Sequence, residues 1–109
     1  MPSEDTLPKD LTPITGIDAN LHAPARLRIL AVLCVVDRAD FTFLLQQTGL
    51  TRGNLSTHLA RLEEGGYVKI KKVFADRKPR TLIWLSARGR SAIQGYRESM
   101  RQVIEELLR

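Results

Sequence analysis

Residues 52–61 concentrate the side-chain types that can recognise a nucleic acid. An arginine can pair bidentately with guanine, an asparagine with adenine, and a serine or threonine hydroxyl can reach a phosphate or a base edge. Gly53 adds a position without a side chain, where backbone N–H groups could approach a phosphate. The side chains of this candidate reading surface are those of Arg52, Asn54, Ser56, Thr57 and Arg61.

A helix has to carry this surface. Thr51 can cap its N-terminus, and the glycines at 65 and 66 stop it. Leu55, Leu59 and Leu62 follow one another at spacings of four and three, so they form one apolar stripe that faces the core. At about 100° per residue, the reading surface lies opposite this stripe or beside it. An ordinary solvated helix face is the alternative, and the basic segment that follows argues against it.

A second cationic cluster comprises Arg77, Lys78 and Arg80. Apolar residues and lysines alternate just before it, over residues 67–71, as is typical of a half-solvated strand, and residues 81–85 can pair with them. The pattern predicts a hairpin in which residues 75–80 form the turn and Pro79 holds the cations in a short loop. Arginines in such a loop can enter the narrow minor groove of A·T-rich DNA or neutralise phosphates.

Three residues each admit two interpretations. His58 projects to the edge of the apolar stripe, where it is either a packed, hydrogen-bonded histidine or a phosphate contact, and we keep it among the candidate DNA contacts. Trp84 lies on the opposite strand face from Ile83 and Leu85, which favours packing of the hairpin or of an interface over base stacking. Cys34 stands in a long apolar run, so we expect a small core hydrophobe rather than a redox-sensing thiol.

Two further helices must precede the reading surface. A proline at its first position and apolar residues at helical spacing predict a helix over about residues 24–36. Asp40 or Thr42 can cap a second helix, which ends at Gly49 in a tight turn. A tight turn therefore joins the second helix to the helix that carries the reading surface.

A final helix follows the hairpin, and Ser86 can cap it. Its apolar stripe continues beyond what one small domain needs for its own core. The helix either folds back on the first helix or pairs with a second subunit, and we favour pairing. The candidate dimer-interface residues are Ile93, Tyr96, Met100, Val103 and Leu107.

Composition and charge agree with a basic, soluble, single domain. The net charge of the 109 residues is +5, and residues 51–81 hold most of the surplus, which attracts polyanions. The longest apolar run, residues 29–36, is too short to cross a bilayer, and the N-terminus does not resemble a secretion signal. We expect a cytoplasmic protein without membrane contact.

Catalysis and metal chemistry find little support. One cysteine and two histidines make a poor set of zinc ligands and allow no internal disulfide. The sequence has no glycine-rich phosphate loop and does not gather a nucleophile, a base and an orienting group. We expect no enzyme, no metal and no cofactor.

The order of these elements predicts a mainly α fold with a small β-hairpin (α+β). It is that of a winged helix-turn-helix with a three-helix core, a wing and a C-terminal dimerisation helix. We expect a flexible arm over residues 1–13, a winged helix DNA-binding domain over 14–97 and the end of the dimerisation helix over 98–109.

Five stretches together closely resemble the winged-helix DNA-binding domain family related to the MarR and ArsR transcriptional regulators. They are LHAPARLRIL (21–30), GNLSTHL (53–59), LEEGGYV (62–68), DRKPRT (76–81) and LSARGR (85–90). The resemblance spans about residues 17–97. The chain lacks the paired cysteines of the metal-sensing ArsR members, so we do not expect metal sensing.

The resemblance implies a homodimer whose two recognition helices and two wings contact a pseudo-palindromic operator in double-stranded DNA. It implies DNA contacts at Arg52, Asn54, Ser56, Thr57, Arg61, Arg77, Lys78 and Arg80. The alternative function is a winged-helix protein–protein interaction module that does not bind DNA. RNA binding is less favoured, because surface aromatics that stack single-stranded bases are lacking. A small-molecule effector is left open, because no convergent polar groups mark a pocket for it.

Overall fold

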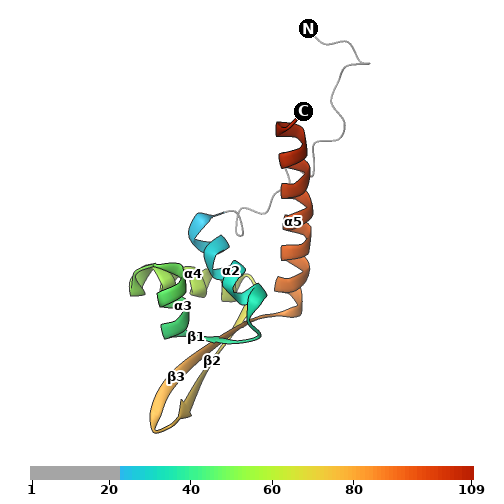
Figure 1. The fold of residues 1–109 in the computed structure, drawn as a ribbon. Coiled ribbons are helices and arrows are strands. Elements are labelled where there is room, and N and C mark those ends of the chain that lie inside the picture. The colour runs from blue at the N-terminus through green and yellow to red at the C-terminus, as the bar shows by residue number, and fades with distance from the viewer. Residues whose placement is uncertain (1–22) are drawn as a thin grey trace.

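Residues 23–109 are described by a computed structural model, and over this range four helices and three strands follow one another (Figure 1). The helices are α2 (Pro24–Val35), α3 (Phe41–Thr48), α4 (Arg52–Glu64) and α5 (Ala87–Leu107), and the strands are β1 (Ala39–Asp40), β2 (Val68–Ala75) and β3 (Lys78–Leu85). This order confirms the predicted mainly α fold with a hairpin. The short strand β1 was not predicted. The predicted arm over residues 1–13 lies outside the described residues.

Three polar side chains start the helices as predicted. Asp40, Thr51 and Ser86 cap α3, α4 and α5, and each accepts a hydrogen bond from the backbone N–H three residues further on, at 2.7, 3.2 and 2.9 Å. Of the two candidate caps for α3, the structure uses Asp40 and not Thr42. Helix α3 ends at Gly49, whose φ of +69° is a left-handed conformation that favours glycine. Gly49 and the Thr51 cap thus make up the short connection between α3 and α4.

The hairpin is longer, and its turn tighter, than the sequence pattern predicts. Strands β2 and β3 pair antiparallel from Val68 opposite Leu85 to the end of the ladder, and β1 adds a short pairing on the other edge of β3. Only Asp76 and Arg77 form the turn, both with positive φ, as in the two-residue turns whose twist matches that of the strands. The prediction that Pro79 lies in the turn is wrong, because Pro79 belongs to β3 and pairs with Phe74 of β2. Strand β1 pairs with β3 only at residues 82 and 83, so the missing N–H of Pro79 costs no hydrogen bond of the sheet.

The core receives side chains from α2, α3, α4 and the sheet. The predicted stripe on α4 is confirmed, since Leu55, Leu59 and Leu62 are only 0, 3 and 1% exposed. Each such side chain contributes about 1.5–3 kcal/mol by leaving water. The largest fully buried side chains are Ile29, Leu33, Leu44, Leu55, Leu62 and Ile83. With its leucine stripe inside, α4 turns its polar side outward.

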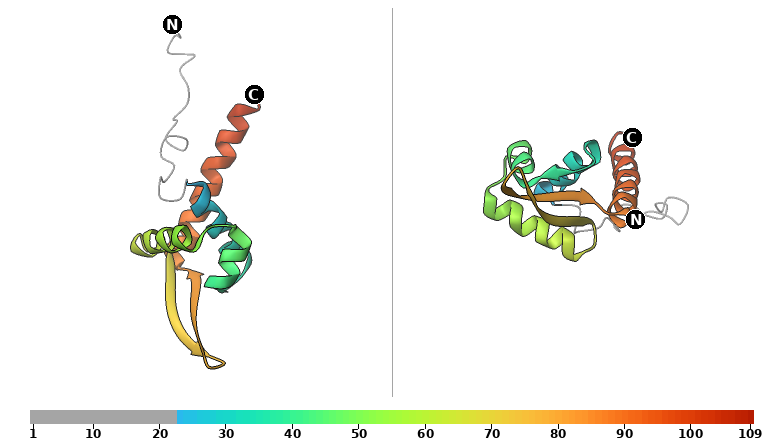
Figure 2. Two further views of the ribbon diagram at one scale, coloured as in Figure 1. Left: turned by 90° about the vertical axis from the view of Figure 1, so that its left-hand side faces the viewer. Right: turned by 90° about the horizontal axis from the view of Figure 1, so that it is seen from below.

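The wing, by which we mean β2, the Asp76–Arg77 turn and β3, and the distal half of α5 project from opposite ends of the helical body (Figures 1 and 2). The start of α5 is fixed at the base of the wing. Ser86 donates its backbone N–H to the carbonyl oxygen of Tyr67 at 3.1 Å and its hydroxyl to that of Gly66 at 2.5 Å. The end of α4, the root of the wing and the start of α5 therefore form one junction. Over residues 23–109, no helix is long and apolar enough to cross a bilayer.

Candidate nucleic-acid interface

The outer side of α4 presents the predicted reading surface to solvent. All five of its side chains are exposed, whereas the leucines on the opposite side of the helix are buried. Gly53 is exposed as well, and a Cβ placed on it would meet no atom within 4 Å. The first turn of α4 is thus open to close approach by a ligand. The members of the surface are Arg52, Asn54, Ser56, Thr57 and Arg61.

Arg52 is held in place by an aromatic ring of the preceding helix. Its guanidinium carbon lies 5.9 Å from the centroid of Phe41, the first residue of α3, which is a cation–π contact. Such a contact restrains the long side chain while leaving its donors free to point outward. The role of Phe41 was not predicted, because nothing in the local sequence links it to Arg52.

A hollow of about 450 Å³ joins the beginnings of α3 and α4 to the wing. We call it the cationic hollow, because it brings Arg52 of α4 together with Lys78 and Arg80 of β3. The Asp40 carboxylate at its rim caps α3 and accepts from the N–H of Phe43. Cations, hydroxyls and a nearby helix N-terminus suit a phosphate. Its lining consists of Asp40, Phe41, Thr42, Arg52, Lys78, Pro79, Arg80 and Thr81.

The tip of the wing sets Arg77 apart from the other two predicted cations. Arg77 has a φ of +64° in the turn, which costs a residue other than glycine roughly 1–2 kcal/mol. Lys78 and Arg80 belong to β3 and line the cationic hollow. Arg80 also lies 3.7 Å from the exposed carboxylate of Asp76, a weak surface ion pair. The three cations therefore occupy the tip and the side of the wing, and not one loop.

His58 takes part in a contact between helices. The Nε of Arg26 on α2 donates a hydrogen bond to its Nδ1 at 3.3 Å, and the residue is half-buried. Burial, and then the positive charges of Arg26 and Arg61, lower the pKa of His58 below its ordinary value. Of the two interpretations left open by the sequence, the packed and hydrogen-bonded histidine is the one that this geometry supports.

Trp84 has a packing partner that the sequence did not indicate. The guanidinium carbon of Arg38 lies 4.9 Å from the centroid of the indole ring. Trp84 pairs with Lys69 across the ladder, whereas its neighbours Ile83 and Leu85 are buried on the other face. This arrangement agrees with the expected packing role of Trp84.

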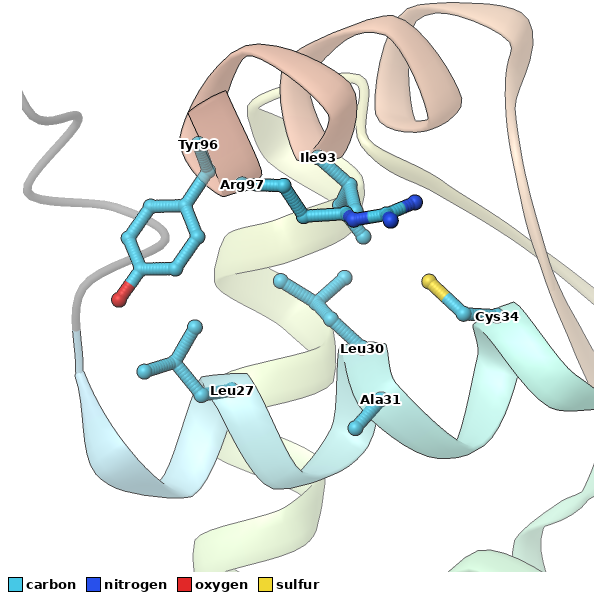
Figure 3. A pocket seen from close by; sticks show the side chains of 7 residues that line it. All are labelled: Leu27, Leu30, Ala31, Cys34, Ile93, Tyr96 and Arg97. Atoms are coloured by element: carbon cyan, nitrogen blue, oxygen red, sulfur yellow. The ribbon is translucent and has the colours of Figure 1, made fainter. Parts of the chain in front are cut away.

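Cys34 is exposed, so the prediction that it belongs to the core is wrong. The buried side of α2 carries Ile29, Leu30 and Leu33, and Cys34 lies at the margin where α2 faces α5. There it borders an apolar hollow of about 360 Å³ (Figure 3). The hollow is lined by Leu27, Leu30, Ala31, Cys34, Ile93, Tyr96 and Arg97. Side chains of α5 line the other side of this hollow, so the hollow, and not the core, borders Cys34 (Figure 3).

The predicted interface stripe on α5 divides into two parts. Ile93 and Tyr96 are half-buried and pack against the core of their own domain. Further along, Leu107 is 77% exposed and Ile104, which is not among the predicted interface residues, is 51% exposed. On another side of the helix, Arg101 pairs with Glu98 and Glu105. The distal half of α5 thus combines an exposed apolar side with a charged one.

Helices α2 to α4 and the wing define a winged helix-turn-helix domain. Residues 25–104 match the family described as winged helix DNA-binding domain, and the chain belongs to this family. The predicted resemblance is thereby confirmed. Among residues 23–109, we find no group of three or more histidine, cysteine, aspartate or glutamate residues that could hold a metal ion.

Two archaeal proteins are similar to this chain in sequence. A transcriptional regulator homologue from Pyrococcus horikoshii OT3 is 34% identical, with 87% of this chain and 96% of that chain covered and a TM-score of 0.82. An uncharacterised protein of Methanocaldococcus jannaschii is 36% identical over 75 residues, which are 69% of this chain and 82% of the relative.

More distant structures share the fold. A MarR-family transcriptional regulator from Enterococcus faecalis V583 has a TM-score of 0.72 at 18% identity, with 97% of this chain and 94% of that chain covered. The transcriptional repressor CouR, bound to a 23-mer DNA duplex, also has a TM-score of 0.72, at 20% identity, with 91% and 68% covered. This chain therefore shares its fold with these two regulators.

Proposed function

We propose that this chain is a transcriptional regulator that binds specific sequences of double-stranded DNA as a homodimer. In this proposal α4 enters the major groove, and the wing contacts the minor groove or the phosphates beside it. The cationic hollow carries the proposal, because it joins the reading helix and the wing through Arg52, Lys78 and Arg80.

Base recognition falls to the outer side of α4. Asn54 lies in its first turn and Arg61 in its last, and both side chains are exposed. They can pair with adenine and guanine, while Ser56 and Thr57 reach phosphates or base edges. His58 is left out of the proposed contacts, because its Nδ1 already accepts a hydrogen bond from Arg26.

Phosphates are the natural ligands of the cationic hollow and of the first turn of α4. A phosphate in the hollow could bind the cations of both elements at once, which would fix the position of the helix relative to the wing. The open backbone at Gly53 offers N–H groups to a second phosphate. Arg77 at the tip remains for the minor groove.

Dimerisation is assigned to the distal half of α5. Met100, Val103 and Ile104 are about half-exposed and Leu107 is largely exposed, at spacings that place them along one side of the helix. Pairing such helices about a twofold axis would bury this apolar side and present two reading helices to one duplex. Ile93 and Tyr96 would support the interface from within each domain.

Selection from a pool of random duplexes tests this function. We expect the full chain to enrich an inverted repeat whose half-sites lie about one helical turn apart. No enrichment of any duplex would contradict the proposal and favour a protein-interaction module.

Sedimentation of the free protein tests the dimer separately. We expect the wild type to be dimeric and Val103→Asp to be monomeric, with Gln94→Asp, an exposed polar position of the same helix, as the control. A Val103→Asp protein that stays dimeric would exclude the distal half of α5 as the interface.

A further inference from the structure

Phe74 is a large apolar side chain in an exposed position on a basic hairpin. It lies one residue before the end of β2 and is 74% exposed. Its partner across the ladder is Pro79, which is exposed as well. The far end of the wing thus carries two apolar residues side by side, beyond the reach of the core.

The register of the ladder places this pair on the side of the wing that faces α4. Alternate pairs share a face, so Phe74 with Pro79 follows Lys72 with Thr81 and, nearer the core, Ile70 with Ile83. Ile83 is fully buried, and a hollow of about 610 Å³ between α4 and the wing is lined in part by Ile70, Lys72 and Thr81. A ligand that contacts α4 and this side of the wing would therefore meet Phe74.

The surroundings of Phe74 select the chemistry of that ligand. Lys72 precedes it on the same face, Lys78 and Arg80 flank Pro79 on β3 and project from the other face of the wing, and Arg77 lies in the turn. The ligand must therefore offer an apolar surface bordered by negative charge. The minor groove of duplex DNA has this character, since sugars and base edges lie between two rows of phosphates. Apolar side chains that enter it separate neighbouring bases and kink the helix.

We propose that Phe74, backed by Pro79, inserts from the wing into the minor groove and unstacks one base step in each half-site. The inference rests on the proposed DNA-binding function. The fixed φ of proline holds its ring in place, and the phenyl group has few torsions to lose. Pyrimidine–purine steps unstack most easily, so Phe74 would contribute sequence preference at a step where no hydrogen bond is read.

Fluorescence of 2-aminopurine reports unstacking directly, because stacking quenches its emission. The base is placed in turn at each adenine of the duplex enriched by the wild type, and emission is recorded at saturating protein and low salt. We expect the wild type to raise emission several-fold at one step per half-site. Phe74→Ala should abolish this rise and weaken binding about tenfold, with an unchanged salt dependence because no cation is lost. Phe74→Leu should keep most of the rise.

Val35→Ala provides the matched control, because Val35 is an apolar residue at least as exposed as Phe74 and lies at the end of α2, outside the wing. It should behave as the wild type. Duplex binding without a rise at any step, or a rise that survives Phe74→Ala, would overturn the insertion and leave DNA binding standing. A Phe74→Ala protein that loses only self-association would assign Phe74 to a contact between copies and would also overturn it. If the wild type binds no duplex, the proposed function fails first, and the insertion fails with it.

Discussion

The Nε of Arg26 on α2 donates a hydrogen bond to Nδ1 of His58 on α4 across 3.3 Å. This bond ties the reading helix to the first helix of the domain. It requires the neutral imidazole, because a protonated Nδ1 has no lone pair to accept with. Protonation of Nδ1 at low pH would therefore break this contact between α2 and α4.

We expect stability to fall as the pH drops below the ordinary histidine pKa of 6.5. Burial, and then Arg26 and Arg61, lower the pKa of His58 in the folded chain, so between that lowered pKa and 6.5 the unfolded chain binds the extra proton. The contribution of His58 to the free energy of unfolding is complete above pH 6.5 and is lost as the pH falls toward the lowered pKa of the folded chain. Urea unfolding at several pH values measures it. His58→Asn keeps an acceptor near Arg26 without titrating, so its pH dependence should be weaker; equal dependence in both proteins would contradict the assignment.

Gly89 allows α5 to start close to the wing. A Cβ on Gly89 would lie 2.0 Å from the carbonyl oxygen of Tyr67, and the obstacle is backbone, which yields poorly. We expect Gly89→Ala to lower the free energy of unfolding by about 2 kcal/mol or more. Gly95→Ala, in the same helix, is the control, because its Cβ would meet nothing within 4 Å and should stabilise by roughly 0.5–1 kcal/mol. Similar denaturation midpoints for both variants would refute the close contact.

Base readers and phosphate binders should differ in their effect on specificity. Asn54→Ala should cost about 1–3 kcal/mol on the preferred duplex and relax its sequence preference, because a base contact is lost. Arg80→Ala should weaken binding to all duplexes similarly. Competition between the enriched duplex and a scrambled one measures both effects. An unchanged preference in Asn54→Ala would show that the reading surface has been assigned to the wrong side of α4.

We expect Arg77 to lower the stability of the fold and to strengthen DNA binding. Its φ of +64° suits glycine better than arginine, so Arg77→Gly should stabilise the fold by about 1 kcal/mol while weakening DNA binding. Asp76→Gly, at the neighbouring residue with a φ of +52°, relieves a similar conformation but removes a negative charge, and should not weaken binding. Thermal unfolding and duplex titration give the two quantities. Wild-type affinity in Arg77→Gly would exclude a DNA contact at the tip.

The elements of this fold that depend on local chemistry were predictable from sequence. The caps at Thr51 and Ser86, the left-handed end at Gly49 and the leucine stripe of α4 each follow from neighbouring residues. The strands of the hairpin were predicted too short. Two-residue turns usually contain glycine or asparagine, and the turn here consists of Asp76 and Arg77. Strand β1 is two residues long and exists only through its pairing with β3.

The candidate site was predicted in its members but not in its geometry. The cations of α4 and of the wing were identified, yet their meeting in one hollow depends on the packing of α3 between them. Phe41 and Phe74 were missed, the first because its contact with Arg52 is tertiary and the second because the strand was ended too early. Cys34 was misassigned because an apolar run does not show which of its residues the next helix will cover.

The salt dependence of duplex binding shows whether DNA phosphates occupy the cationic hollow. If the cationic hollow seats a phosphate, Arg52→Gln and Lys78→Gln, one from each side of it, should each reduce the slope of log affinity against log salt by about 0.9. Arg109→Gln, at the far end of the chain from the wing, should leave the slope unchanged (Figure 1). No duplex binding by the wild type at low salt, or slopes in the two hollow variants equal to that of the wild type, would contradict the account.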